Sequence, residues 1–384
     1  MSEPAIAPLF APQDEPPAAE HTTGILPSQS LRHAIANHLV QAPDPILEEQ
    51  IQPASLDLRL GPQAYRVKAS FLPGRSATVK AKLDQLELHR FDLTGGAVLE
   101  RDCVYIIPLL EHLSLRKRIS AIANPKSSTG RLDVFTRLIT DYGTEFDSVR
   151  ERYEGPLYAE VSPRAFPILV RRGSRLMQLR IKRGSPTPSD SSMRELHEQR
   201  PLIDAPMGMA DIKGGIALSV DIDGAGPAQI VGYRARKNAG VIDVDKREFY
   251  DPLDFWEPMQ ARAGRGIILD PHDFYILASK ESITIPTAYA AEMLAYDTSV
   301  GEFRVHYAGF FDPGFGDPEI GAAGTRAVLE VRSHEVPFLI EDGQIIGRLV
   351  YERLIAKPDK LYGQGIGSSY QRQGLTLGKQ FKRG

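Results

Sequence analysis

The stretch Leu99–Glu111, LERDCVYIIPLLE, has a counterpart further along the chain in Leu269–Glu281, LDPHDFYILASKE. Both stretches contain an apolar run rich in β-branched and aromatic residues, which is typical of a β-strand. The same shift of 170 positions aligns further identical residues: Tyr105 with Tyr275, Ile106 with Ile276, Glu160 with Glu330, Pro167 with Pro337, Gly173 with Gly343, and Leu179 with Leu349. So many identities at one spacing indicate two copies of one β fold, and two copies at so long a period indicate a duplicated domain.

Short strand-like segments separated by Gly and Pro account for most of the first copy. They lie at 51–61, 64–70, 104–110, 119–125, 156–162, 166–172 and 175–181. Within 51–61, leucines alternate with polar residues, which predicts a strand with one solvent-facing side. Helical patterns are few: one at 31–40 after a capping signal in 26–30, and one ending near 199 with Asp190 or Ser191 as the expected cap. Regular short strands with so little helix predict a mainly β fold, a sandwich or a barrel.

Composition restricts the class of protein. The chain has 384 residues, a net charge of −3 and 42% hydrophobic residues. This charge argues against a nucleic-acid or anionic-membrane partner, since such surfaces need an excess of Lys and Arg. No apolar run approaches the roughly 20 residues of a membrane span. Residues 1–23 are rich in Pro and Ala and lack the pattern of a signal peptide, so we expect a disordered arm on a cytoplasmic protein.

Metal-binding residues are scarce. Cys103 is the single cysteine, which excludes an internal disulfide and the paired cysteines of zinc-dependent base deaminases. The closest histidines, His33 and His38, are five positions apart, which does not suit a helical metal site. We therefore expect no protein-held transition metal.

A polar loop, KSSTGR from Lys126 to Arg131, follows the strand-like segment at 119–123. Two hydroxyls, two cations and a glycine within six residues can hold an anion, although an ordinary solvated turn has the same composition. The second copy has DTSVGEF there, with Asp297 and Glu302 in place of the cations. Conversely, the second copy has a compact hairpin at 305–315, VHYAGFFDPGF, where the first has the longer and more charged segment 139–155. Each copy thus keeps a different part of a site.

These motifs resemble those of the dCTP deaminase family, a branch of the dUTPase fold. The resemblance covers residues 24–380 and lies in IQPASLDLRLG, PKSSTGRL, HYAGFFDPGF with AVLEV, DGQIIGRLVYERL and SSYQRQGLTLGK. It implies two tandem dUTPase-like domains, each a β-barrel or distorted jelly roll with few short helices. We expect them at 24–184 and 185–384, with residues from about 356 to 384 forming a lid over the nucleotide. A frayed C-terminus is the alternative for that glycine-rich tail.

The resemblance also implies the activity: hydrolytic deamination of dCTP to dUTP and ammonia, in dUTP and dTTP biosynthesis, without a catalytic metal. Magnesium would arrive with the triphosphate, the protein would form a homo-oligomer, and dTTP could inhibit it. Three alternatives stay open at this stage. The enzyme could also cleave dUTP to dUMP, it could be a plain dUTPase, or it could be a nucleotide-binding regulator that has lost catalysis.

Roles for individual residues follow from the same resemblance. The catalytic carboxylate would be Glu330 or Glu160, with Ser127 orienting the water and Arg131 keeping the glutamate in place. Substrate binding would involve Lys126, Ser128, Asp312, Asp147, Tyr362, Tyr370 and Gln373. We favour a composite site that takes Ser127, Ser128 and Arg131 from the first copy and Asp312 and Glu330 from the second. The reverse combination, the Glu302 loop with Asp147 and Glu160, would be inactive.

Overall fold

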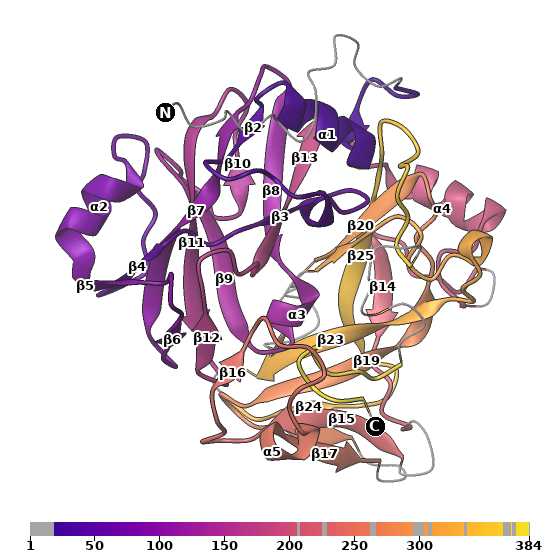
Figure 1. Cartoon of the computed structure of the whole chain (residues 1–384). Coiled ribbons are helices and arrows are strands. Elements are labelled where there is room, and N and C mark those ends of the chain that lie inside the picture. Colours follow the sequence, from indigo (N-terminus) through magenta and orange to yellow (C-terminus); the bar gives the residue numbers. More distant parts are fainter. Residues whose placement is uncertain are drawn as a thin grey trace.

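The computed structural model describes the chain except residues 1–18, 206–207, 225–228, 262–265, 295–302, 306–308, 334–335, 364–369, 371–373 and 384. Strands make up most of the regular structure and the helices are few and short, which confirms the predicted mainly β class. The N-terminal half and the C-terminal half lie side by side, and the chain end returns to the boundary between them (Figure 1). The part of the expected N-terminal arm that is described is not isolated, since the Glu20 and His21 amides donate to the Ile355 carbonyl.

Three sheets form the N-terminal half. The first contains β1 (Gly24–Ile25), β13 (Met177–Arg183), β8 (Ile119–Pro125) and β10 (Ser148–Val149) in that order, with β3 (Leu56–Leu58) also paired to β13. The second has the order β5 (Glu87–Asp92), β4 (Gln63–Val67), β7 (Val104–Ser114), β11 (Glu154–Pro163), β9 (Val134–Thr140), with β2 (Val40–Gln41) paired to β7. The third joins β6 (Ala97–Leu99), β12 (Ile168–Val170) and β16 (Ile242–Asp243).

The C-terminal half has a matching set of sheets. One has the order β14 (Ile216–Ser219), β25 (Ile345–Arg353), β20 (Tyr289–Leu294), β22 (Phe310–Phe311). Another has the order β17 (Trp256–Gln260), β15 (Ile230–Ala235), β19 (Phe274–Ile283), β23 (Thr325–Ser333), β21 (Phe303–Val305). A third pairs β18 (Ile267–Leu269) with β24 (Phe338–Ile340).

Strand register repeats between the halves at the shift seen in the sequence. Glu160 on β11 lies opposite Ile106 on β7, and Glu330 on β23 lies opposite Ile276 on β19. The equivalent tyrosines make equivalent bonds: the Tyr105 hydroxyl accepts from the Glu100 amide at 3.0 Å and the Tyr275 hydroxyl from the Asp270 amide at 2.9 Å. Glu160 and Glu330 therefore occupy corresponding positions in the two halves.

Helices occupy the connections. They are α1 (Ser28–Ala36), η1 (Glu48–Gln50), α2 (Val79–Leu86), α3 (Ser127–Gly130), α4 (Asp190–Gln199), α5 (Pro252–Phe255) and η2 (Pro318–Ile320). The expected cap of α4 was wrong by one or two positions, because the Ser189 hydroxyl accepts from the Ser192 amide. The capping signal expected before α1 is also absent, since its N-cap is Pro27, which has no side-chain acceptor.

The predicted solvent-facing side of the strand at 51–61 is wrong. Leu56, Asp57 and Leu58 are all buried, as is Arg59. The buried charges are paired, with Asp57 bonded to Lys126 and the Arg59 Nε donating to Glu111 at 2.8 Å. Alternating polar residues in this strand therefore reflect ion pairs inside the protein, which a pattern of hydropathy cannot distinguish from exposure.

The two halves are tied together around β16. This short strand of the C-terminal half pairs in parallel with β12, and Arg171 donates to both oxygens of Asp243 at 2.8 Å. Below it, an aromatic cluster combines residues from both halves and the chain end: Phe166, Tyr250, Phe255, Trp256 and Phe381. Burial of each such side chain contributes about 1.5–3 kcal/mol, so the halves and the tail are held in one arrangement. Among the helices that the structure describes, none is long and apolar enough to cross a membrane.

Candidate active site

A cavity of about 900 Å³ lies where the two halves meet. Its walls include Ser127, Ser128 and Arg131 from the N-terminal half, and Asp312 and Glu330 from the C-terminal half. Lys126, Tyr362 and Tyr370 also line it. The structure thus brings together, within a single chain, the residues that we assigned to a composite site.

The hydroxyl-bearing wall is the single helical turn α3. Pro125 ends β8, and the extended Lys126 then precedes a turn in which the Arg131 amide donates to the Ser127 carbonyl at 3.0 Å. Ser128 is buried and Ser127 is half-buried beside the cavity. The Lys126 ammonium pairs with the Asp57 carboxylate. This turn therefore presents two hydroxyls and a cation to the same space.

Arg131 lies at the centre of this wall and is almost fully buried. Its Nη1 donates to the Thr376 carbonyl at 3.0 Å, and its guanidinium carbon lies 3.7 Å from the centre of the Tyr370 ring. Its Nε is 3.9 Å from the Glu330 Oε1. The tail thus fixes the guanidinium beside Glu330 at a distance too long for a direct hydrogen bond.

Glu330 is a buried carboxyl group on β23 that faces the cavity. Burial raises its pKa from 4.5 to about 7, and the positive charge of Arg131 opposes that rise. A carboxyl group with a pKa near neutrality can both take up and release a proton at working pH. The environment of Glu330 therefore suits general acid–base chemistry.

Glu160, its counterpart on β11, is equally buried but does not line the cavity. Its Oε1 accepts from Arg137 Nη2 at 2.6 Å and from Nε at 3.1 Å. Asp147 is also elsewhere: its carboxylate accepts from the Leu138 amide at 2.7 Å, and burial raises its pKa to about 7. The structure therefore places neither Glu160 nor Asp147 beside Ser127.

Asp312 reaches the cavity from the hairpin after β22. Burial raises its pKa to about 6, while the charges of Arg180 and Lys126 lower it and that of Asp57 raises it. Two residues named in the sequence comparison, Asp297 and Glu302, lie outside the described residues.

The C-terminal tail closes one side of the cavity. The Tyr362 amide donates to the Pro313 carbonyl at 2.9 Å, and the Tyr370 hydroxyl accepts from the Lys379 amide at 3.1 Å. Beyond them, Phe381 is buried in the aromatic cluster. Gln373 lies outside the described residues. The tail is thus attached at both ends of the segment that contains Tyr370.

Sequence reasoning assigned no role to four other cations that line the cavity: Arg175, Arg247, Lys360 and Lys379. Lys360 donates to the carbonyls of Glu48 at 3.1 Å and Ile51 at 3.2 Å. Burial lowers the pKa of Lys379, and the nearby charges of Lys126 and Arg247 lower it further. These cations come from separate segments, so no local motif predicts them. Acidic side chains line the cavity as well, and Glu49 and Glu48 pair with Arg175 and Lys360.

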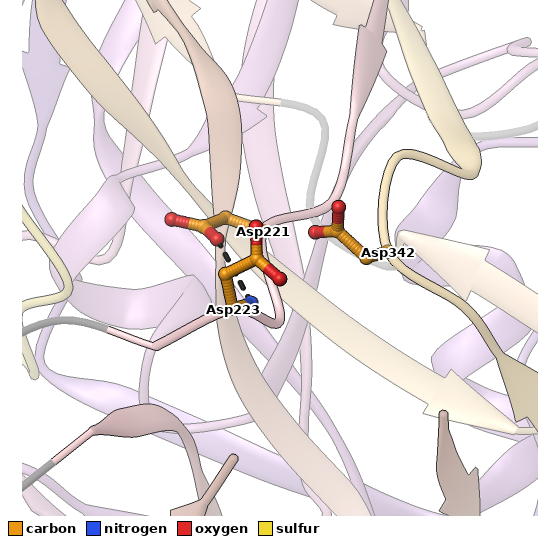
Figure 2. A group of neighbouring side chains, drawn as sticks. All are labelled: Asp221, Asp223 and Asp342. Atoms are coloured by element: carbon orange, nitrogen blue, oxygen red, sulfur yellow. Dashed lines mark hydrogen bonds between the residues drawn. The ribbon is translucent and has the colours of Figure 1, made fainter. Parts of the chain in front are cut away.

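The part of the cavity lining that the structure describes contains carboxylates but neither histidine nor cysteine. A separate group of carboxylates, Asp221, Asp223 and Asp342, lies outside the cavity lining (Figure 2). Asp221 pairs there with Arg326 and Asp342 with Lys280, while the Asp223 amide donates to Asp221 at 3.1 Å. Two cations thus face three carboxylates, and each carboxylate has one of these cations within ion-pair distance.

The fold and the cavity define a protein with two copies of one β unit that enclose a buried carboxylate and a set of cations between them. Profiles of two protein domains match almost the whole chain. The N-terminal domain of 2′-deoxycytidine 5′-triphosphate deaminase matches residues 22–185, and the C-terminal domain of the same protein matches residues 189–381. The chain belongs to the dCTP deaminase family.

Individual relatives agree with this assignment. The crystal structure of 2′-deoxycytidine 5′-triphosphate deaminase from Agrobacterium tumefaciens is 54% identical, with a TM-score of 0.83 over 88% of this chain and 100% of that chain. A dCTP deaminase, dUMP-forming, from Corynebacterium glutamicum is 27% identical over 154 residues, which are 39% of this chain and 76% of that protein. One from Halobacterium salinarum, also called dUMP-forming, is 32% identical over 114 residues, 29% of this chain and 54% of the relative.

Proposed function

We propose that this protein converts dCTP and water to dUTP and ammonia. The observation that carries the proposal is that Glu330 and Arg131, from opposite halves of the chain, lie 3.9 Å apart and line one cavity with Ser127. Membership of the dCTP deaminase family supports the substrate class.

Glu330 serves as the proton shuttle in this proposal. Its carboxylate removes a proton from water as the hydroxide attacks C4 of cytosine, and it passes this proton to the ring nitrogen N3. It then takes the proton of the new C4 hydroxyl and delivers it to the amino group, so that the C4–N bond breaks, ammonia leaves and a C4 carbonyl remains. A pKa near 7 supports both steps, because neither protonation state is inaccessible at neutral pH.

Ser127 and Arg131 act on the same water and the same carboxylate. The Ser127 hydroxyl orients the attacking water, and the Arg131 guanidinium keeps Glu330 in place and stabilises negative charge beside it. Their fixed positions support this role, since α3 packs at the end of β8 and Arg131 is bonded to the tail.

The remaining lining residues bind the nucleotide. Lys126, Ser128 and the cations of the cavity hold the triphosphate, to which magnesium is already bound in solution. Asp312 accepts a hydrogen bond from the 3′-hydroxyl of the sugar, while Tyr362, Tyr370 and Gln373 belong to a lid. No protein-held metal takes part. The anionic and cationic lining, without imidazole or thiolate among the described residues, supports that choice.

The architecture belongs to the same proposal. We infer that residues 24–184 and 185–384 are tandem dUTPase-like barrels, that the chain forms a homo-oligomer, and that dTTP inhibits by binding at the substrate cavity. The repeated strand register supports the tandem arrangement.

A second candidate is a bifunctional enzyme that goes on to cleave dUTP to dUMP and pyrophosphate. Its support is that the curated relatives quoted above are called dUMP-forming. These relatives match less than half of this chain, whereas the Agrobacterium tumefaciens protein, which matches along its whole length, is described only as a deaminase.

Product analysis tests both candidates. Purified protein is incubated with dCTP, CTP or dCMP, and ammonia, pyrophosphate and nucleotides are measured. We expect equal amounts of ammonia and dUTP from dCTP. Equal amounts of ammonia, dUMP and pyrophosphate would favour the second candidate, and bound dCTP without ammonia would contradict both.

A further inference from the structure

A fully buried arginine joins the two halves behind the candidate site. Arg180 lies on β13 of the N-terminal half and has no exposed side-chain surface. Its Nη1 donates to the Ala291 carbonyl at 3.1 Å and its Nη2 to the Phe311 carbonyl at 3.4 Å, both in the C-terminal half. Burial of a guanidinium is costly unless it is well paired, so this position calls for an explanation.

The same guanidinium faces the hairpin that carries Asp312. Nη2 lies 3.8 Å from the Asp312 Oδ1, and the guanidinium carbon lies 3.9 Å from the centre of the Phe310 ring. Arg180 thus contacts three consecutive hairpin residues. Oδ1 of Asp312 is buried and accepts no hydrogen bond from a described residue, so one acceptor of this cavity-lining carboxylate has no described donor.

The fold itself does not require this arginine. The shift of 170 positions puts Val350 on β25 at the place that Arg180 occupies on β13. Their cross-strand partners differ as well: Arg180 lies opposite Ile122, and Val350 lies opposite Glu292. A cation at this position therefore exists in one half alone, and it points at the hairpin that lines the cavity.

The positive charge of Arg180 favours the ionised form of Asp312. The charges of Arg180 and Lys126 oppose the rise in the Asp312 pKa that burial and Asp57 cause. A neutral carboxyl group would donate as well as accept, whereas an ionised one accepts at both oxygens. Loss of Arg180 would remove one of the two cations that favour the ionised form.

We propose that Arg180 is a positioning residue for sugar recognition, which holds the carboxylate of Asp312 where it accepts a hydrogen bond from the nucleotide 3′-hydroxyl. The inference rests on the proposed function, which gives Asp312 that contact. The inference also states that specificity for the sugar depends on Arg180, a side chain of the N-terminal half that does not line the cavity.

Two ligands that differ only in the 3′-hydroxyl group test this inference. In Glu330→Gln protein, calorimetry compares the dissociation constant of dCTP with that of 2′,3′-dideoxycytidine triphosphate, which lacks the 3′-hydroxyl. We expect a preference for dCTP of about tenfold or more, the size of a hydrogen bond to a charged acceptor. Addition of Arg180→Met should abolish this preference and leave the affinity for the dideoxy ligand unchanged.

Lys182→Met is the matched control. Lys182 lies on the same strand and pairs with Glu352 of the other half at 2.9 Å, but it does not line the cavity. We expect this variant to keep the preference. Retention of the preference in Arg180→Met, or equal weakening of both ligands, would overturn the inference.

A conservative variant covers the case in which Arg180→Met does not fold, as judged by circular dichroism. Lysine keeps the charge but cannot reach both carbonyls and the Phe310 ring at once. Arg180→Lys should therefore lower the preference for dCTP several-fold, and an unchanged preference would overturn the inference. Lack of any preference in the Glu330→Gln parent would overturn the role of Asp312 and with it this inference, whereas absence of ammonia release from wild-type protein concerns the chemistry alone.

Discussion

Glu330 and Glu160 occupy equivalent positions in the two halves, and both are buried opposite an isoleucine of the neighbouring strand. Their surroundings differ in the distance to the nearest arginine. Arg131 Nε stays 3.9 Å from Glu330, whereas Arg137 Nη2 is bonded to Glu160 at 2.6 Å. Glu330 faces a cavity of about 900 Å³, and Glu160 is not part of its lining.

The difference shows that two buried carboxylates at equivalent positions can have different surroundings. The Glu160 carboxylate accepts two hydrogen bonds from the Arg137 guanidinium and does not line the cavity. A carboxylate that is desolvated but not directly bonded to its cation keeps a pKa near neutrality and can exchange protons with a substrate. We therefore assign the chemistry to the C-terminal copy of this strand and a structural role to the N-terminal copy.

The largest expected effect separates the two glutamates. Glu330→Gln should reduce kcat for ammonia release by about 10²- to 10⁴-fold, because the amide cannot transfer the protons. Glu160→Gln should keep kcat within about threefold, well below the effect of losing an acid–base group. Steady-state assays on both variants provide the test. Normal turnover in Glu330→Gln with loss of turnover in Glu160→Gln would reverse the assignment.

Replacement of Arg131 should have the second-largest effect on kcat. Arg131→Ala should lower kcat roughly a hundredfold, because Glu330 then has no cation beside it and its pKa rises further above 7. Arg131→Lys keeps the charge without the planar contacts to Tyr370 and Thr376, so we expect an intermediate rate. Comparison of kcat for the three proteins checks this order, and an unchanged rate in Arg131→Ala would exclude Arg131 from the site.

The tail is expected to act mainly on substrate binding. Deletion of the residues after Tyr362 removes Tyr370 and Lys379 from the cavity wall, so the KM for dCTP should rise about tenfold or more. Phe381→Ala tests the anchor by itself: it keeps Tyr370 and Lys379 in the chain but loosens the attachment of the tail to the aromatic cluster, so we expect a smaller rise in KM than in the truncated protein. An unchanged KM in the truncated protein would contradict a lid.

Several features of this arrangement were predictable from the sequence. The shift of 170 positions relates Glu160 to Glu330, and the strands do pair in equivalent registers. Resemblance to a family pointed to Arg131 and Asp312, since their motifs are local. The ion pair between Arg137 and Glu160 was not predictable, because any arginine nearby in the fold could have made it. The expected solvent exposure of Asp57 was wrong for a related reason, because its ion-pair partner, Lys126, is 69 positions away in the sequence.

Protein stability gives a further comparison and shows the energetic cost of burying the Glu330 carboxylate. The pKa of Glu330 is about 7 in the folded protein and 4.5 when the side chain is exposed to water, as in the unfolded chain. The folded state therefore holds the proton more tightly. Stability therefore falls as pH rises from 4.5 to 7. Glu330→Gln removes this loss and should be up to about 3 kcal/mol more stable than wild type above pH 7, with no difference below pH 4.5.

Denaturant unfolding at several pH values measures that difference. Glu160→Gln is the matched variant, and we expect it to be destabilised by about 1–3 kcal/mol at neutral pH because Arg137 loses its charged partner. Equal stability of Glu330→Gln and wild type at pH 8 would mean that burial of the ionised Glu330 carboxylate does not destabilise the folded protein.

A count of bound nucleotide tests most directly the claim that one site per chain is built from both halves. Calorimetric titration of Glu330→Gln protein with dCTP should give one binding site per chain, and the additional change Glu160→Gln should leave that number and the affinity unchanged. Two equivalent sites per chain, or loss of binding with Glu160→Gln, would contradict the account.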